Sequence, residues 1–100
     1  MYPLRVLYLP CATLTTHQVL FAASSKKVKL AVDRNKLKRR MREAYRLHNH
    51  LLLGGKGTHF LLGYVYIGSS EVSPFAILQE KMIASFQYLN EQYTRTDLNL

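Results

Sequence analysis

Cysteine, acidic residues and long apolar runs are scarce in this chain, and each absence excludes a class of protein. The single cysteine, Cys11, cannot form an internal disulfide, which fits a reducing compartment such as the cytosol. No apolar run approaches the roughly 20 residues that a membrane-spanning helix needs. Residues 1–10 lack the basic head, long apolar stretch and small-residue cleavage site of a signal peptide. We therefore expect a cytoplasmic protein that does not enter a membrane.

Acidic residues are outnumbered, and the imbalance is confined to one window. The 100 residues include 14 Lys or Arg and 6 Asp or Glu, a net charge of +8. The whole excess lies between Lys26 and Arg46, where ten basic residues face only Asp33 and Glu43, while four bases balance four acids elsewhere. Charge concentrated in this way points to a polyanionic partner, which could be RNA, DNA or an acidic membrane surface.

The rest of the composition indicates one globular domain over residues 1–100, because 48% of the residues are hydrophobic and 11% aromatic. Residues 3–9 and 17–24 are rich in β-formers and predict two short strands. The segment 10–16 between them suits a loop that closes an antiparallel pair. Residues 59–68 are almost wholly apolar and predict a buried strand.

Two further stretches have helical periodicity. Apolar residues at three- and four-residue spacing predict a helix over about residues 33–50, with Asp33 as its N-cap. Ser73 as N-cap and Pro74 at the first helical position predict a second helix over about residues 74–93. The order β-β-α-β-α indicates an α+β two-layer sandwich, in which the helices pack on a mixed sheet. The strand-helix-strand unit would be a parallel crossover, right-handed by default.

On a helical wheel the first helix has two faces. Leu37, Met41 and Tyr45 fall in an apolar sector. Like-charge pairs four residues apart along this helix are unfavourable by about 0.2–0.5 kcal/mol each. A polyanion would relieve that repulsion, so we interpret the charged sector as a binding surface rather than a merely solvated one. This sector presents one amide and four cations: Asn35, Lys38, Arg39, Arg42 and Arg46.

Other interpretations of the basic window explain less. An interfacial membrane helix needs bulky apolar residues for the lipid, and this helix needs its own for the core. A nuclear-localisation signal would account for only the five residues KLKRR. No catalytic group is expected, because Asp33 and Glu43 lie ten residues apart and cannot form a carboxylate pair. No metal site is expected either, since His48 and His50 are two apart on a helix and diverge.

Residues 25–46, SKKVKLAVDRNKLKRRMREAYR, resemble the signature of the bacterial ribonuclease P protein subunit, S-K-K-x-G-x-A-V-x-R-N-R-x-K-R-x-x-R-E-x-F/Y-R. Lys29 replaces the glycine of that pattern, and Lys36 replaces its second arginine and loses the planar fork. The strand and helix order is similar to the carboxy-terminal part of that fold, which implies a left-handed crossover around the basic helix. The matching residues are Ser25, Lys26, Lys27, Ala31, Val32, Arg34, Asn35, Lys38, Arg39, Arg42, Glu43, Tyr45 and Arg46.

The family's amino-terminal helix and first strand have no counterpart here. The resemblance therefore implies a truncated or divergent member with an incomplete cleft for the tRNA leader.

The resemblance implies that this chain assists a catalytic RNA in removing the 5′ leader from precursor tRNA, as the protein part of an endoribonuclease. The RNA and its bound Mg²⁺ would do the chemistry, with no catalytic residue, membrane or small-molecule substrate involved on the protein side. Tyr8 would face the single-stranded leader and stack on a base, or else remain a half-buried strand tyrosine. The alternative is a non-catalytic RNA- or DNA-binding module, such as a ribosomal or regulatory protein. The RNA-binding residues implied are Lys26, Lys27, Arg34, Asn35, Lys36, Lys38, Arg39, Arg42 and Arg46.

Overall fold

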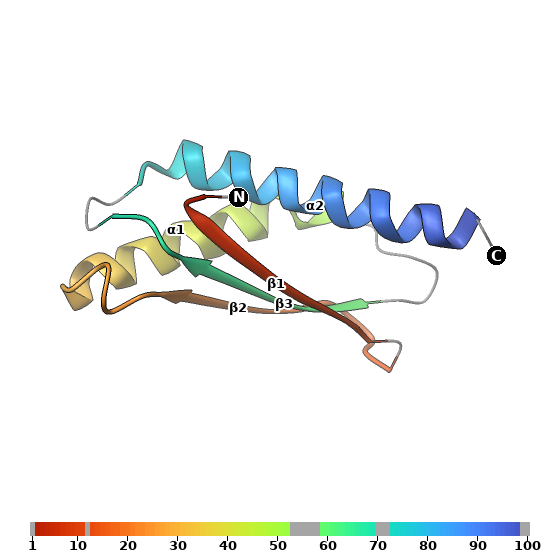
Figure 1. The fold of residues 1–100 in the computed structure, drawn as a ribbon, viewed down its shortest axis with the longest axis horizontal. Helices are drawn as coiled ribbons and strands as arrows, with labels where there is room; N and C mark the ends of the chain where they lie inside the picture. Colours follow the sequence, from red (N-terminus) through yellow and green to blue (C-terminus); the bar gives the residue numbers. More distant parts are fainter. Residues whose placement is uncertain (1, 12, 53–58, 70–72, 99–100) are drawn as a thin grey trace.

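A computed structural model describes residues 2–11, 13–52, 59–69 and 73–98 of the chain (Figure 1). Its elements confirm the predicted β-β-α-β-α order and the α+β class. Along the chain they are β1 (Leu4–Cys11), β2 (Gln18–Ala23), α1 (Ala31–His48), the short 3-10 helix η1 (Asn49–Leu51), β3 (His59–Tyr66) and α2 (Phe75–Leu98).

The three strands form a mixed sheet with β3 in the centre, in the order β1-β3-β2. β3 pairs antiparallel with β1 and parallel with β2. The parallel crossover from β2 through α1 to β3 is thus confirmed, and its hand stays a prediction. The predicted antiparallel pairing of residues 3–9 with 17–24 is wrong, because β3 separates these strands. β3 is the most buried strand and is hydrogen-bonded to a neighbour on each side, whereas Pro10 lacks an N–H and is tolerated on the edge strand β1.

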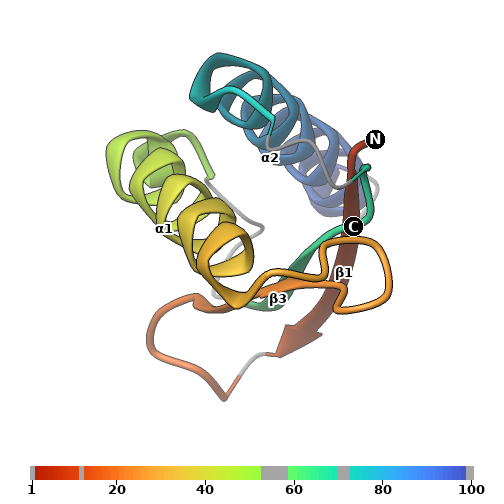
Figure 2. The same ribbon diagram turned by 90° about the vertical axis from the view of Figure 1, so that its left-hand side faces the viewer.

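Both helices cover the same face of the sheet, which gives two layers (Figure 2). Every second residue of β3 faces them and is buried. Full burial of each large apolar side chain contributes roughly 1.5–3 kcal/mol. The core that results includes Phe60, Leu62, Tyr64 and Tyr66 from β3, Leu37, Met41 and Ala44 from α1, and Leu78, Met82, Phe86 and Leu89 from α2.

α1 begins at Ala31, two residues earlier than predicted, so Asp33 is not its N-cap. Leu30 takes the N-cap position without a side-chain hydrogen bond. Its carbonyl accepts the N–H groups of Asp33 and Arg34, each at 3.1 Å. Asp33 lies in the first turn instead, where a carboxylate interacts favourably with the helix dipole.

α2 begins at Phe75, one residue later than predicted. The carbonyl of Pro74 accepts the N–H of Leu78 at 3.4 Å. The hydroxyl of Ser73, predicted to cap this helix, lies 3.0 Å from the Tyr66 hydroxyl and hydrogen-bonds with it. The loop before α2 is therefore tied to the end of β3.

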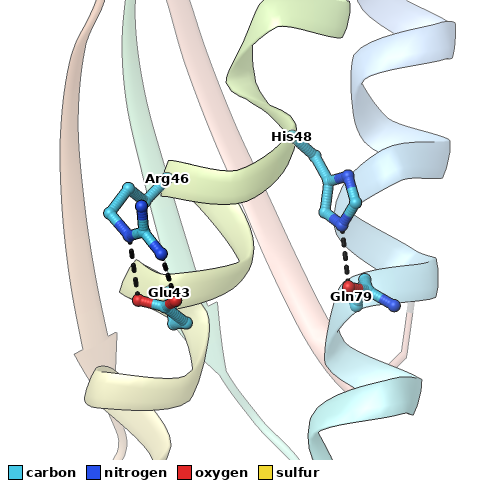
Figure 3. A network of polar contacts seen from close by, with 4 residues as sticks. All are labelled: Glu43, Arg46, His48 and Gln79. Carbon is cyan, nitrogen blue, oxygen red and sulfur yellow. Dashed lines mark hydrogen bonds and ion pairs between the residues drawn. The ribbon is translucent and has the colours of Figure 1, made fainter.

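Side-chain hydrogen bonds fix α1 against α2. Arg40 donates through Nη1 to the carbonyl of Ser73 at 2.7 Å. About one turn after the start of α2, Gln79 meets His48 of α1, with 2.7 Å between Oε1 and Nε2 (Figure 3). Arg40 is thus a structural residue within the basic helix.

His17 connects the start of β2 to the start of β3. Its Nδ1 accepts the N–H of Phe60 at 2.9 Å, and its ring stacks on that of Phe60. The His59 ring lies 5.0 Å away. Burial, together with the charge of His59, lowers the pKa of His17 from its ordinary 6.5, although a hydrogen bond to the Leu52 carbonyl opposes the change. Protonation would remove the lone pair that holds Phe60.

We predict that acidification weakens the fold through His17. Because the folded pKa is lower than the unfolded one, this contribution to stability is present above about pH 6.5 and is lost as the pH falls through the folded pKa. His17→Asn offers an amide oxygen to the Phe60 N–H without titrating. Thermal unfolding across this range should show a shallower pH dependence for His17→Asn than for the wild type. Identical pH profiles would contradict this assignment.

Gly68 is required by a close approach of Tyr66. A Cβ at residue 68 would lie 2.6 Å from the Tyr66 Oη and 3.0 Å from the Pro3 Cβ. We predict that Gly68→Ala lowers the free energy of unfolding by roughly 1–3 kcal/mol, measured by chemical denaturation. Gly63→Ala is the matched control, because its Cβ would meet Leu7 at an ordinary 3.6 Å. Equal losses in the two variants would count against steric exclusion at Gly68.

Candidate nucleic-acid interface

Core packing decides which side of α1 faces the solvent. Leu37, Met41 and Ala44 are buried in the sheet-facing side of the helix. The opposite side carries the basic face, by which we mean Asn35, Lys38, Arg39, Arg42 and Arg46. All of these are exposed except Lys38, which is partly buried, as are Arg34 and Lys36. The structure therefore brings the predicted residues of the helix's outer side onto one surface.

The basic face lies beside the edge strand β2. The Arg42 guanidinium lies over the ring of Phe21 in β2, 5.9 Å from its centroid. Phe21 in turn packs edge to face against Tyr45 of α1, with ring centroids 5.9 Å apart. A cation over an exposed aromatic ring contributes about 0.5–1 kcal/mol. Arg42 thus has a defined position at the middle of the basic face.

Arg46 is already engaged by an acid. Its Nε and Nη2 donate to the two carboxylate oxygens of Glu43, at 3.1 and 2.5 Å (Figure 3). Hydrogen bonds from Arg46 lower the pKa of the Glu43 carboxyl, and Glu43 raises the pKa of Arg46. An incoming phosphate would therefore compete with Glu43 for Arg46. The sequence placed both residues correctly on the helix, but nothing in the pattern indicated that they pair.

The turn between β2 and α1 adds more positive charge. Lys26 and Lys27, predicted as supporting residues, are exposed there, and so is Lys29, which was not predicted as a site residue. Arg34 has a different environment: its Nη1 donates to the carbonyls of Val28 and Lys29, both at 2.8 Å. No pattern of residue types indicates this contact, because it joins a helix side chain to the backbone of the preceding turn.

Tyr8 lies away from the basic face, on the other edge strand. β1 packs near α2, and the Tyr8 ring meets Tyr88 of α2 edge to face, with centroids 6.4 Å apart. Tyr8 is 41% exposed and Tyr88 45%. A cavity of about 360 Å³ lies here, and Tyr2 and Arg5 also line it. The structure therefore separates the predicted leader residue from the predicted RNA-binding helix by the width of the sheet.

Tyr2 and Tyr88 were missed from the sequence. Tyr88 lies outside the apolar stripe of its helix, which begins at Phe75 and continues through Leu78 and Met82. An aromatic residue that lies outside the buried stripe of an amphipathic helix is expected to face the solvent. The position of Tyr88 in the sequence could therefore have indicated an exposed ring. Tyr2 precedes the predicted strand and offered no comparable pattern.

Two negative findings concern the described part of the chain. Among residues 2–11, 13–52, 59–69 and 73–98, no three His, Cys, Asp or Glu side chains lie close enough together to hold a metal ion. Over the same residues, neither α1 nor α2 is long and apolar enough to cross a membrane.

Comparisons with known proteins agree with the signature of residues 25–46. The family model described as Ribonuclease P matches residues 2–89. The Ribonuclease P protein component of Chlorobaculum tepidum is 42% identical over 64 residues, which are 57% of this chain and 42% of that protein. The protein of the same name from Chlorobium phaeobacteroides is 42% identical over 74 residues, 65% of this chain and 51% of that protein.

The chain thus spans about half the length of these curated relatives. No solved structure matches it. The family model nevertheless covers nearly all of the described elements, including the basic helix and the whole sheet. This chain belongs to the ribonuclease P protein family.

Proposed function

We propose that this chain binds the catalytic RNA of ribonuclease P in the cytoplasm and assists removal of the 5′ leader from precursor tRNA. The observation that carries the proposal is the basic face, where core packing turns four cations of one rigid helix toward the solvent. Its span from Asn35 to Arg46 is roughly 16 Å at about 1.5 Å per residue, long enough to follow several phosphates of one strand. Membership of the ribonuclease P protein family favours this function over the alternative of a non-catalytic ribosomal or regulatory protein.

In this proposal the Mg²⁺ ions are bound by the RNA, and the protein lowers the Mg²⁺ concentration that the reaction requires. Mg²⁺ is bound through phosphate oxygens and waters in such sites and screens the repulsion between phosphates. Cations of the basic face would neutralise some of those phosphates and release their counterions. The protein's contribution is then to hold and orient RNA, and its own side chains perform no bond cleavage.

The single-stranded leader would contact the cavity between β1 and α2. Tyr8 and Tyr88 present exposed rings there, and Arg5 lines the same cavity. Stacking of a base on such a ring is worth about 1–3 kcal/mol and does not depend strongly on the base. The proposed leader site therefore tolerates many leader sequences, as a general processing factor requires.

We predict that Arg42→Glu lowers the affinity for the catalytic RNA by on the order of tenfold or more, because it reverses a charge in the middle of the basic face. The free energy of unfolding should change by no more than about 1 kcal/mol. Filter binding measures the affinity for the RNA, and thermal unfolding measures the stability. Lys81→Glu on α2 is the matched control and should bind nearly as the wild type does. A large loss of stability with unchanged affinity for the RNA would mean that Arg42 is structural.

We also predict that Glu43→Gln strengthens RNA binding, by roughly two- to fivefold, because it frees Arg46 and removes a negative charge from the interface. Binding measured over a salt series should show a steeper dependence for this variant. Glu80→Gln, an exposed acid on α2, is the control for a general change in net charge. Weaker binding of Glu43→Gln would mean that Glu43 instead holds Arg46 in its binding position.

A further inference from the structure

The turn that joins β2 to α1, residues 24–30, is built more firmly than an ordinary surface loop. The N–H of Ser24 donates to the carbonyl of Tyr66 in β3 at 3.3 Å. The N–H of Val28 donates to the carbonyl of Ser24 at 2.8 Å. The Val28 side chain is fully buried in the core. One hydrogen bond therefore ties the start of this turn to β3, a second closes the turn on itself, and Val28 anchors it in the core.

Arg34 fixes the second half. Its Nη1 carries two hydrogens and reaches two carbonyls, those of Val28 and Lys29, both at 2.8 Å. A cation in the first turn of a helix is disfavoured by the helix dipole, and two carbonyl oxygens offset that cost. The planar guanidinium holds both acceptors in one geometry, which a lysine ammonium does not reproduce. Arg34 thus clamps the backbone of the turn onto α1.

The clamped turn displays three lysines. Lys26, Lys27 and Lys29 are all exposed. Among the described residues of the basic window, Arg46 pairs with Glu43, whereas these three lysines form no ion pair with a described acid of that window. Lys29 is an addition of this chain, since the family signature has a glycine at its position. The lysine turn, as we name Lys26, Lys27 and Lys29, lies next to the first turn of α1 and extends the basic surface beyond the helix.

We propose that the lysine turn is a distinct phosphate-binding element, that Lys29 belongs to it, and that Arg34 is a positioning residue which acts through it. This inference rests on the proposed RNA-binding function. Ammonium groups contact phosphates as point charges and carry no base preference, so the turn adds affinity and register rather than sequence readout. Arg34, although it matches an RNA-binding position of the signature, serves mainly by holding the backbone from which these lysines project.

A double-mutant cycle on the full chain tests how Arg34 acts. We compare affinities for the catalytic RNA of the wild type, Arg34→Gln, a triple alanine variant of the lysine turn, and the combination. Arg34→Gln should weaken binding about fivefold alone and less than about 1.5-fold in the triple background, because residues that act as a unit are not additive. Full additivity would overturn the positioning role. Arg39→Gln is the control and should be additive, since Arg39 lies on the basic face.

Lys29 is tested by salt dependence. Lys29→Ala should lower the slope of log affinity against log salt by about 0.7–1, the change expected for one lost phosphate contact. An unchanged slope would remove Lys29 from the element. The control is Lys81→Ala on α2, whose slope should equal that of the wild type.

A readout without RNA separates this inference from the proposed function. In limited trypsin digestion followed by mass spectrometry, Arg34→Gln should be cut faster after Lys26, Lys27 and Lys29 than the wild type. Apart from the site that the substitution itself removes, after residue 34, cleavage elsewhere should be unchanged. Unchanged cleavage at these bonds would overturn the clamp. If the wild type failed to bind the RNA, the proposed function and the phosphate contacts would fail together, and the digestion pattern would still decide whether Arg34 holds the turn.

Discussion

The orientation of α1 against the sheet is the constraint on which the candidate interface depends. Leu37, Met41 and Ala44 form its only fully buried strip. Rotating the helix would bury arginines and lysines, and removing an unpaired charge from water costs several kcal/mol even after relaxation. The basic side chains therefore face the solvent because burying them in the core would be too costly. A narrow apolar strip is therefore enough to determine which way the whole basic face points. The hydrogen bond from Arg40 to the Ser73 carbonyl, just before α2, also holds the helix in place.

The two edges of the sheet carry different chemistry. Along β2 lie the basic face and the lysine turn, which suit phosphates. Along β1 lies the cavity with Tyr8 and Tyr88, which suits unstacked bases. β3 lies between these two edges and holds them at a fixed distance, because it is hydrogen-bonded to β1 on one side and to β2 on the other. A rigid body with one surface for each kind of contact is well suited to positioning one RNA relative to another.

Local chemistry was predictable from the sequence, and long-range geometry was not. Helical periodicity located the basic helix and its two faces, since the spacing of Leu37 and Met41 is a property of neighbouring residues. Pairing of the strands depends on which strand is central, and the turn signals around Pro10 do not encode that choice. The role of Arg34 was hidden for a related reason, because its acceptors are backbone carbonyls of the turn before the helix. The pairing of Glu43 with Arg46 depends on rotamers that a pattern of residue types does not fix.

The central claim is that this chain supports cleavage of precursor tRNA by lending its cations to a catalytic RNA. The most direct measurement is the rate of leader removal by the cognate catalytic RNA at low Mg²⁺, with and without the chain. The account predicts that the chain raises this rate strongly at low Mg²⁺ and that the advantage shrinks as Mg²⁺ is increased, because the metal then screens the same phosphates. A rate at low Mg²⁺ that does not change when the chain is added would contradict it.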